Sequence, residues 1–264
     1  MQSNRTKNRI REAIARKGNA IGTFLGISTP SIVEAVSDSG LDYVIIDTEH
    51  GTYDLSAVSD MIRAADLSGL CPVVRISDPT HQEIQHAVDN GAEGIIVPCL
   101  RDLDDFYKIV EQGKFAPIGN RGFIKGRGSR FGIEDWASGS LEAYMENSNE
   151  KVLLLPQCET MEALEHIEEI VAIEGIDGVF VGPFDLSISM GIPGQFNHPQ
   201  FCNAMDRILS ACKKTGKICM TFTSTAEEAR TYIKRGYDAV ANSLDSIIFA
   251  QAFKEMVERI TKQQ

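Results

Sequence analysis

The sequence predicts an α/β protein of the TIM (β/α)8 barrel class, and three observations support this prediction. Short apolar runs alternate with longer stretches of helical periodicity over nearly the whole chain. The runs are apolar at successive positions, which is typical of parallel strands buried on both faces. No G-x-G-x-x-G motif follows the first run, which argues against a doubly wound open sheet. The length of 264 residues suits one barrel of about 250 residues, so we expect a single barrel domain over 1–264.

The elements follow in a regular order. Ile10, Ala13 and Ile14 share one helical face, so we expect an extra N-terminal helix that covers the bottom of the barrel rather than an organelle presequence. Strands are predicted at 20–25, 43–47, 72–76, 94–97, 152–157, 177–181, 218–222 and 238–242. Helices are predicted near 30–39, 54–68, 80–90, 101–113, 160–172, 198–215, 225–235 and 244–261. Glycines such as Gly91 and Gly236 mark the ends of helices before the next strand.

The spacing of strands and helices breaks once, between residues 97 and 152. The gap has room for a helix, a glycine-rich loop and a second short helix around 139–148. The loop at 117–131 carries four basic residues and no acid: Arg121, Lys125, Arg127 and Arg130. Two interpretations remain open, in which the loop either grips an anionic substrate through residues such as Arg121 or contacts an acidic neighbouring subunit.

The composition excludes several classes of protein. With 26 Lys and Arg against 37 Asp and Glu, the net charge is −11, which argues against a nucleic-acid partner. No apolar run approaches the roughly 20 residues that span a membrane. Six cysteines without a C-x-x-C pair indicate reduced thiols and a cytoplasmic protein. Four of them adjoin apolar runs and are expected to pack as small hydrophobic residues: Cys71, Cys99, Cys158 and Cys219.

Polar and charged residues gather where the predicted strands end, which is the edge of a barrel that carries functional groups. Singly, each has a structural explanation: Asp185 is a good helix N-cap, and Glu159 suits the start of a helix. Their concentration at one rim nevertheless predicts a functional site. The residues at these strand ends are Asp47, Glu49, His50, Arg75, Gln157, Glu159, Gly182, Pro183, Asp185 and Asn242.

These residue types favour chemistry on a 2-oxo acid. Carboxylates from neighbouring strands, without a His-x-x-x-His or a cysteine pair, favour a divalent cation such as Mg²⁺ or Mn²⁺, with Co²⁺ as a further candidate, over Zn²⁺. Such an ion stabilises an enolate, and Arg75 would add positive charge beside it. His50, three residues after Asp47, has the residue types of a general base with its orienting acid.

Two absences narrow the class of reaction further. No predicted strand contains a lysine that could form a Schiff base. The loops after the last two strands lack the glycines that favour a phosphate site. A metal-dependent reaction on a non-phosphorylated 2-oxo acid fits both absences.

Several motifs in this order resemble the HpcH/HpaI aldolase family, the metal-dependent class II pyruvate aldolases, from about residue 18 to 258. They are Asp47-Thr48-Glu49-His50-Gly51, Val74-Arg75, Gly91-Ala92-Glu93-Gly94-Ile95-Ile96-Val97-Pro98, Pro117-Ile118-Gly119-Asn120-Arg121-Gly122, Gln157-Cys158-Glu159-Thr160, Gly182-Pro183-Phe184-Asp185-Leu186-Ser187, Ser189-Met190-Gly191 and Pro193-Gly194.

The resemblance implies a role for each matching residue. Glu159 and Asp185 would bind the metal, Gln157 would lie beside pyruvate, and the backbone at Gly182-Pro183 would receive the carboxylate of pyruvate. His50, supported by Asp47, would be the acid/base, and Arg75 would stabilise the enolate.

The resemblance also implies a reaction and an assembly. The reaction is reversible cleavage of a 4-hydroxy-2-oxo acid to pyruvate and an aldehyde. The assembly is a homo-hexamer, a trimer of dimers, in which the C-terminal helix is exchanged between subunits.

Some features leave alternatives open. Thr23-Phe24 and Thr48 depart from residues frequent in the family, and neither removes a functional group. Phe123-Ile124-Lys125 also departs from it, in a loop expected to contribute to acceptor recognition. A lyase or decarboxylase acting on oxaloacetate or an acyl-CoA ester remains an alternative, as does a non-catalytic barrel that binds a 2-oxo acid.

Overall fold

Eight parallel strands form a closed barrel in chain order in the computed structural model, which describes residues 7–261. The predicted TIM-barrel fold is therefore confirmed, and each predicted strand lies within two residues of its observed position. The strands are β1 (Ala20–Leu25), β2 (Tyr43–Asp47), β3 (Cys71–Arg75), β4 (Gly94–Val97), β5 (Leu153–Cys158), β6 (Gly178–Val181), β7 (Ile218–Thr223) and β8 (Ala239–Leu244).

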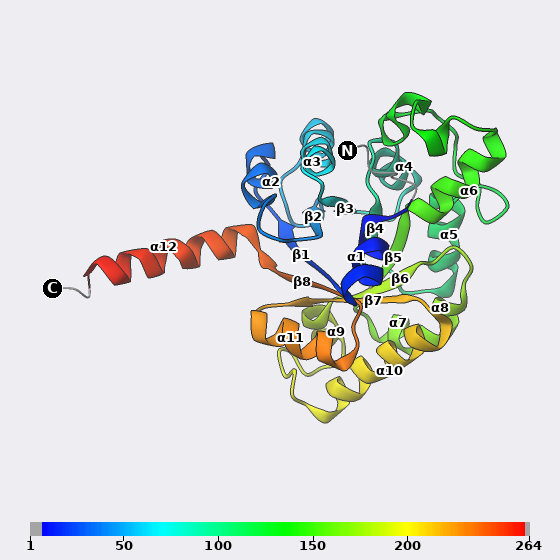
Figure 1. The fold of residues 1–264 in the computed structure, drawn as a ribbon. Coiled ribbons are helices and arrows are strands. Elements are labelled where there is room, and N and C mark those ends of the chain that lie inside the picture. Colours follow the sequence, from blue (N-terminus) through cyan, green and yellow to red (C-terminus); the bar gives the residue numbers. More distant parts are fainter. Residues whose placement is uncertain (1–6, 262–264) are drawn as a thin grey trace.

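Helices surround the barrel and cover the outward faces of its strands (Figure 1). They are α1 (Arg9–Lys17), α2 (Pro30–Val36), α3 (Leu55–Leu67), α4 (His81–Asp89), α5 (Leu103–Gly113), α6 (Leu141–Lys151), α7 (Met161–Glu165), α8 (Ile167–Ala172), α9 (Pro183–Ser189), α10 (Pro199–Thr215), α11 (Ala226–Arg235) and α12 (Asp245–Thr261). Two 3₁₀ helices, η1 (Arg127–Gly132) and η2 (Asp135–Ala137), precede α6.

The alternation of side chains along each strand decides which residues face the interior of the barrel. In β2, Tyr43 and Ile45 belong to the interior cluster, whereas Val44 and Ile46 pack against the outer helices. Because successive side chains point to opposite faces, Asp47 continues the inward series at the carboxyl end of β2. The last inward-facing residue of a strand therefore lies at the rim of the barrel, where the strands end.

The helix α1 closes the amino-terminal end of the barrel, as the sequence predicts. Ile10 and Ala13 are buried and join the interior cluster, and Figure 1 shows α1 lying across the strands. Asn8 caps the helix by accepting from the backbone N–H groups of Ile10 and Arg11. Its Nδ2 donates to the carbonyl oxygens of Glu93 and Lys151, at 2.7 and 2.8 Å.

The structure differs from the predicted elements in two places. The predicted helix at 160–172 is interrupted at His166, whose backbone leaves helical geometry, so α7 and α8 are separate. The sequence also did not predict α9, although Asp185 was recognised as a residue that favours a helical turn. Pro183 stands at the first turn of α9, where its missing N–H needs no partner.

The last helix, α12, extends away from the barrel (Figure 1). It contacts β1 and β8 near its beginning, and most of its large apolar side chains are exposed. Within the described residues, no helix combines the length and apolar character that crossing a membrane requires.

Candidate active site

A cavity of about 240 Å³ opens where the strands end. Most of the side chains predicted for the site line it: Asp47, His50, Arg75, Gln157, Gly182, Pro183 and Asp185. They come from the ends of β2, β3, β5 and β6. Glu159 follows β5 and approaches Gly182, so it joins the same rim.

Asp47 and Arg75 form a buried pair because β2 and β3 are paired in a register that places these residues side by side. The Arg75 guanidinium donates to both Asp47 oxygens, from Nε at 2.8 Å and from Nη2 at 2.7 Å. Its Nη1 lies 3.0 Å from Oε2 of Glu49, and its Cζ lies 4.8 Å from the centre of the Phe24 ring. Burial by itself lowers the pKa of Arg75, but the hydrogen bonds and charge of Asp47 raise it above its ordinary value. Arg75 is therefore a fixed cation at the rim.

His50 does not receive its orientation from the carboxylate of Asp47 in this structure. Oδ1 of Asp47 accepts from the backbone N–H groups of Glu49, at 3.2 Å, and of His50, at 3.5 Å. The carboxylate nearest to the imidazole is that of Glu49, 3.9 Å from Nε2. The reason is the register of β2 and β3, which gives both Asp47 oxygens to Arg75. His50 itself stands exposed at the mouth of the cavity.

Glu159 is a buried carboxylate held by two donors. Its Oε1 accepts from the backbone N–H of Cys99 at 2.7 Å, and Nε2 of Gln157 donates to its Oε2. A Cβ at position 182 would lie 2.8 Å from Nε2 of Gln157 and 3.0 Å from Oε2 of Glu159. A side chain at 182 would therefore push the ends of these two side chains away from the backbone. Burial raises the pKa of Glu159, and although the Cys99 N–H opposes this, Glu49 and Asp185 raise it further.

Cys99 is a residue of the site that the sequence did not predict. It was expected to pack as a small hydrophobic residue, but it is exposed, whereas Cys71, Cys158 and Cys219 are buried as expected. Its φ of 60° lies in the left-handed region, which is uncommon for a residue other than glycine. In this conformation the backbone N–H of Cys99 donates a hydrogen bond to Oε1 of Glu159. Only its position two residues after the end of β4 could have pointed to it.

The residues of the rim fit a hard divalent cation. The carboxylates of Glu49 and Asp185 lie close enough to Glu159 to raise its pKa by repulsion. A cation bound among these three carboxylates would therefore offset their mutual repulsion. Oε1 of Gln157 is buried without a hydrogen-bond partner among the described residues, and it adds a neutral oxygen of the kind such ions accept. No group of three His, Cys, Asp or Glu among residues 7–261 forms a complete metal cage. Ions such as Mg²⁺ are commonly held by one or two carboxylates together with water and substrate.

Arg121 is not brought to this cavity by the structure. Its Nη2 lies 2.7 Å from Oδ1 of Asp89, at the end of α4 that leads into β4. Its guanidinium also covers the Phe115 ring at 4.6 Å. The loop therefore packs beside the amino end of β4, while the cavity lies at the carboxyl ends of the strands. Within one subunit, the substrate-gripping role expected for Arg121 and the acceptor-recognition role expected for its loop have no geometric support.

Lys114, the most deeply buried lysine among the described residues, also lies away from the cavity. Nζ of Lys114 is 2.7 Å from Oδ2 of Asp177 and donates to the carbonyl oxygens of Asn149 and Val152. Burial lowers its pKa. Lys114 follows α5 and does not line the cavity. Its position indicates a structural ion pair with Asp177 rather than a lysine that forms a Schiff base with substrate.

Large apolar side chains complete the cavity, and sequence analysis did not predict them as site residues. They are Phe24, Phe180, Phe184, Phe222, Leu244 and Ile247. The alternation of each strand could have found three of them, because Phe24, Phe180 and Phe222 occupy inward positions of β1, β6 and β7.

Comparisons with known proteins agree with the fold. The family model described as HpcH/HpaI aldolase/citrate lyase matches residues 20–252. A hydroxypyruvate/pyruvate aldolase of Cupriavidus necator is 31% identical over 97% of this chain and 93% of that protein. A 4-hydroxy-2-oxo-heptane-1,7-dioate aldolase of Escherichia coli is 28% identical over 97% of this chain and 96% of that protein. The crystal structure of an HpcH/HpaI aldolase from Desulfitobacterium hafniense has a TM-score of 0.86 at 27% identity, covering 95% of each chain.

Proposed function

Because this chain belongs to the HpcH/HpaI aldolase/citrate lyase family, we propose that it cleaves a 4-hydroxy-2-oxo acid reversibly to pyruvate and an aldehyde. One observation carries the proposal: carboxylates, the Gln157 amide and the fixed guanidinium of Arg75 converge on one cavity at the carboxyl ends of the strands. This set suits a reaction in which negative charge develops on a 2-oxo oxygen.

Each residue of the site has a separate role in the proposed reaction. Arg75 is held by Asp47 and Glu49, so its charge is in place before substrate arrives and needs no rearrangement during the reaction. The backbone at Gly182 and Pro183, where α9 begins, receives the carboxylate of pyruvate. His50, at the mouth of the cavity, is the general base that removes the hydroxyl proton during cleavage and returns it during addition.

Glu159 and Asp185 would hold a divalent cation, Mg²⁺ or Mn²⁺, with the Gln157 oxygen close by. When bound, the cation supplies Lewis-acid stabilisation of the enolate oxygen of pyruvate. Glycine at 182 contributes by leaving room for Gln157 and Glu159 against the backbone.

Exchange of the methyl protons of pyruvate with deuterated solvent, followed by proton NMR, tests the proposal. Half of the aldolase reaction forms the enolate without any aldehyde, so we expect exchange with Mg²⁺ or Mn²⁺ and none after treatment with EDTA. Exchange that persists without metal, or a pyruvate adduct trapped on lysine by borohydride, would contradict the metal-dependent mechanism.

The same assay separates the alternatives. Absence of exchange under every metal would favour a barrel that binds a 2-oxo acid without turning it over. Exchange without aldol product from any aldehyde, together with release of CO₂ from oxaloacetate, would favour a decarboxylase that uses the same enolate.

A further inference from the structure

The apolar part of the cavity is a continuous aromatic surface. Ring centres are 5.8 Å apart between Phe24 and Phe180 and between Phe24 and Phe222, and 6.0 Å apart between Phe222 and Phe184. Phe184 extends this row to Phe196, at 5.0 Å. Phe184 lies directly beside the metal-ligand candidate Asp185 and is 45% exposed. The second substrate, which binds beside pyruvate, therefore meets an apolar surface.

The charges around the cavity disfavour a second anionic group on the substrate. Arg75 is the only arginine or lysine among the described residues that line the cavity, and its guanidinium is already engaged by Asp47 and Glu49. Arg101, on the loop after β4, does not line the cavity and pairs with Glu162 at 3.2 Å. A carboxylate at the far end of an aldehyde would thus lose water without gaining a cation from the same subunit, which is costly.

We propose that the aldehyde partner of this enzyme is uncharged and apolar, and that its side chain packs on Phe184 and Phe222. This inference rests on the proposed function and names its acceptor class. In the addition direction, C3 of pyruvate loses one proton and forms a bond to the aldehyde carbon. The aldehyde oxygen takes up one proton, so every atom of both substrates is kept in the 4-hydroxy-2-oxo acid.

Two four-carbon aldehydes that differ only at the far end test this inference. Butanal ends in a methyl group, and succinic semialdehyde ends in a carboxylate. With pyruvate and Mn²⁺ held constant, we expect kcat/KM for butanal to exceed that for succinic semialdehyde by about tenfold or more, since differences of this size follow from one apolar contact or one unpaired polar group.

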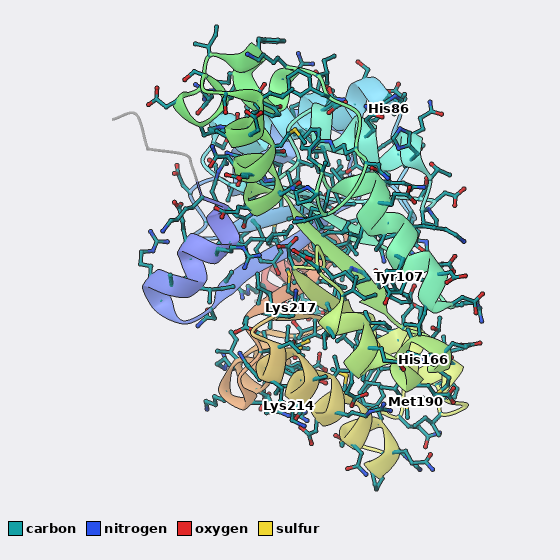
Figure 2. All side chains as sticks on the ribbon, turned by 90° about the vertical axis from the view of Figure 1, so that its right-hand side faces the viewer. His86, Tyr107, His166, Met190, Lys214 and Lys217 are labelled. Atoms are coloured by element: carbon teal, nitrogen blue, oxygen red, sulfur yellow. The ribbon has the colours of Figure 1, made fainter. Side chains whose placement is uncertain are left out.

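Variants of Phe184 test the residue assignment. Phe184→Ala should lower the ratio of the two kcat/KM values about tenfold by removing the apolar surface. Phe184→Arg should raise kcat/KM for succinic semialdehyde, and Phe184→Leu should keep the ratio near that of the parent. Tyr107→Ala is the matched control, because Tyr107 is an exposed aromatic residue on α5, outside the cavity (Figure 2). It should leave the ratio unchanged.

The outcomes separate the inference from the function on which it rests. Equal rates, or a preference for succinic semialdehyde, in a protein that exchanges the protons of pyruvate would overturn the acceptor class and leave the aldolase proposal standing. A ratio unaffected by Phe184→Ala and Phe184→Arg would overturn the role of Phe184. No exchange and no product from either aldehyde would overturn both proposals.

Discussion

At the scale of single residues, Glu159 is a buried carboxylate whose charged form is disfavoured in the absence of a cation. It is 5% exposed. Burial raises its pKa, the Cys99 N–H opposes that effect, and the nearby carboxylates of Glu49 and Asp185 add to it. A group whose charged form is disfavoured by its surroundings, at a rim lined with other acids, is typical of a site that binds a cation.

Glu159→Gln should therefore weaken metal binding without unfolding the protein. The amide has nearly the shape of the carboxylate but brings no charge to the ion. Its oxygen accepts from Cys99, and its NH2 group donates to Oε1 of Gln157, which has no partner among the described residues, once the Gln157 amide turns over. We expect the affinity for Mn²⁺, measured by isothermal titration calorimetry, to fall by on the order of 100-fold. The metal-free variant should melt at or above the temperature of the metal-free parent, because one repelling charge is gone.

A matched control for this variant is Glu162→Gln, on the exposed surface of α7. It removes the same charge three residues away and should leave both Mn²⁺ affinity and pyruvate exchange at parental values. An unaltered affinity in Glu159→Gln would show that Glu159 is not a ligand.

The burial of Tyr43 leads to a prediction of how the stability of the protein depends on pH in the alkaline range. It is fully buried in the barrel, and burial, with smaller contributions from Asp42 and Cys71, raises its pKa well above 10. The unfolded chain ionises tyrosine near pH 10, so above about that pH the unfolded state holds fewer protons than the folded state. The free energy of unfolding then falls as pH rises, by up to about 1.4 kcal/mol per pH unit for each such tyrosine.

Tyr43→Phe should make this fall less steep in urea titrations between about pH 9 and 11. At neutral pH the variant should lose no stability, because the Tyr43 hydroxyl has no hydrogen-bond partner among the described residues. Tyr237→Phe gives the contrast: burial also raises the pKa of Tyr237, but its hydroxyl donates to the Met205 carbonyl at 3.0 Å. That variant should lose about 1 kcal/mol at neutral pH, and equal behaviour of the two would refute this account.

The site residues could be predicted from the sequence where the fold alone dictates their place. Asp47, Arg75 and Gln157 occupy inward positions at the carboxyl ends of strands, and a barrel brings those ends together. Their partners could not be predicted. Asp47 was expected to orient His50, but the register of β2 and β3 places it against Arg75, and register between strands leaves no mark in the periodicity of one strand. The left-handed backbone of Cys99 is equally invisible in the sequence.

At the scale of elements, strands were predicted well because both of their faces are buried. Each reads as a compact apolar run, bounded by turn residues. The short helix α9 escaped prediction because seven residues contain too few apolar repeats to show helical periodicity. The break between α7 and α8 at His166 has no signal of its own, since the apolar pattern continues across it.

The helix α1 should depend strongly on its cap. Asn8 is 1% exposed, accepts from two backbone N–H groups and donates to the carbonyl oxygens of Glu93, just before β4, and of Lys151, at the end of α6. Asn8→Ala removes these bonds and leaves buried groups unpaired, so we expect a loss of about 2 kcal/mol or more in urea unfolding. Ser140→Ala, at the exposed cap of α6, should cost about 1 kcal/mol or less. A smaller loss for Asn8→Ala than for Ser140→Ala would mean that α1 is not a structural closure of the barrel.

At the scale of the whole molecule, the net charge of −11 does not show where the basic residues lie or which acids they pair with. In the loop at 117–131, Arg121 and Arg127 pair with Asp89 and Asp66, and Arg130 pairs with Glu134. The pairs with Asp89 and Asp66 fasten the long insertion between β4 and β5 to α4 and α3, whereas the pair with Glu134 lies within the insertion. The loop is thus part of the packing of its own chain, and its role toward a neighbouring subunit stays a prediction.

The exposed apolar residues of α12 lead to the last prediction, which concerns assembly. Phe249, Phe253, Met256 and Ile260 recur at helical spacing along one side of α12 and are 41 to 66% exposed, and the first two rings stack with centres 6.3 Å apart. A stripe of this kind on a helix that extends from the barrel (Figure 1) is unfavourable in water. We propose that it packs against another copy of the chain in a homo-hexamer with exchanged helices.

Phe253→Glu places a charge in the middle of this stripe and should lower the mass in solution from six chains of 29.0 kDa to a smaller assembly, measured by sedimentation velocity. Gln251→Glu adds the same charge to the same helix, but two residues away along a helix is the opposite side, so its mass should equal that of the parent. A parent chain that sediments as a monomer, or a Phe253→Glu variant that keeps the parental mass, would contradict assembly through α12. Burial of four large side chains per chain is enough to make a stable contact, and for that reason a single buried charge should be enough to weaken it.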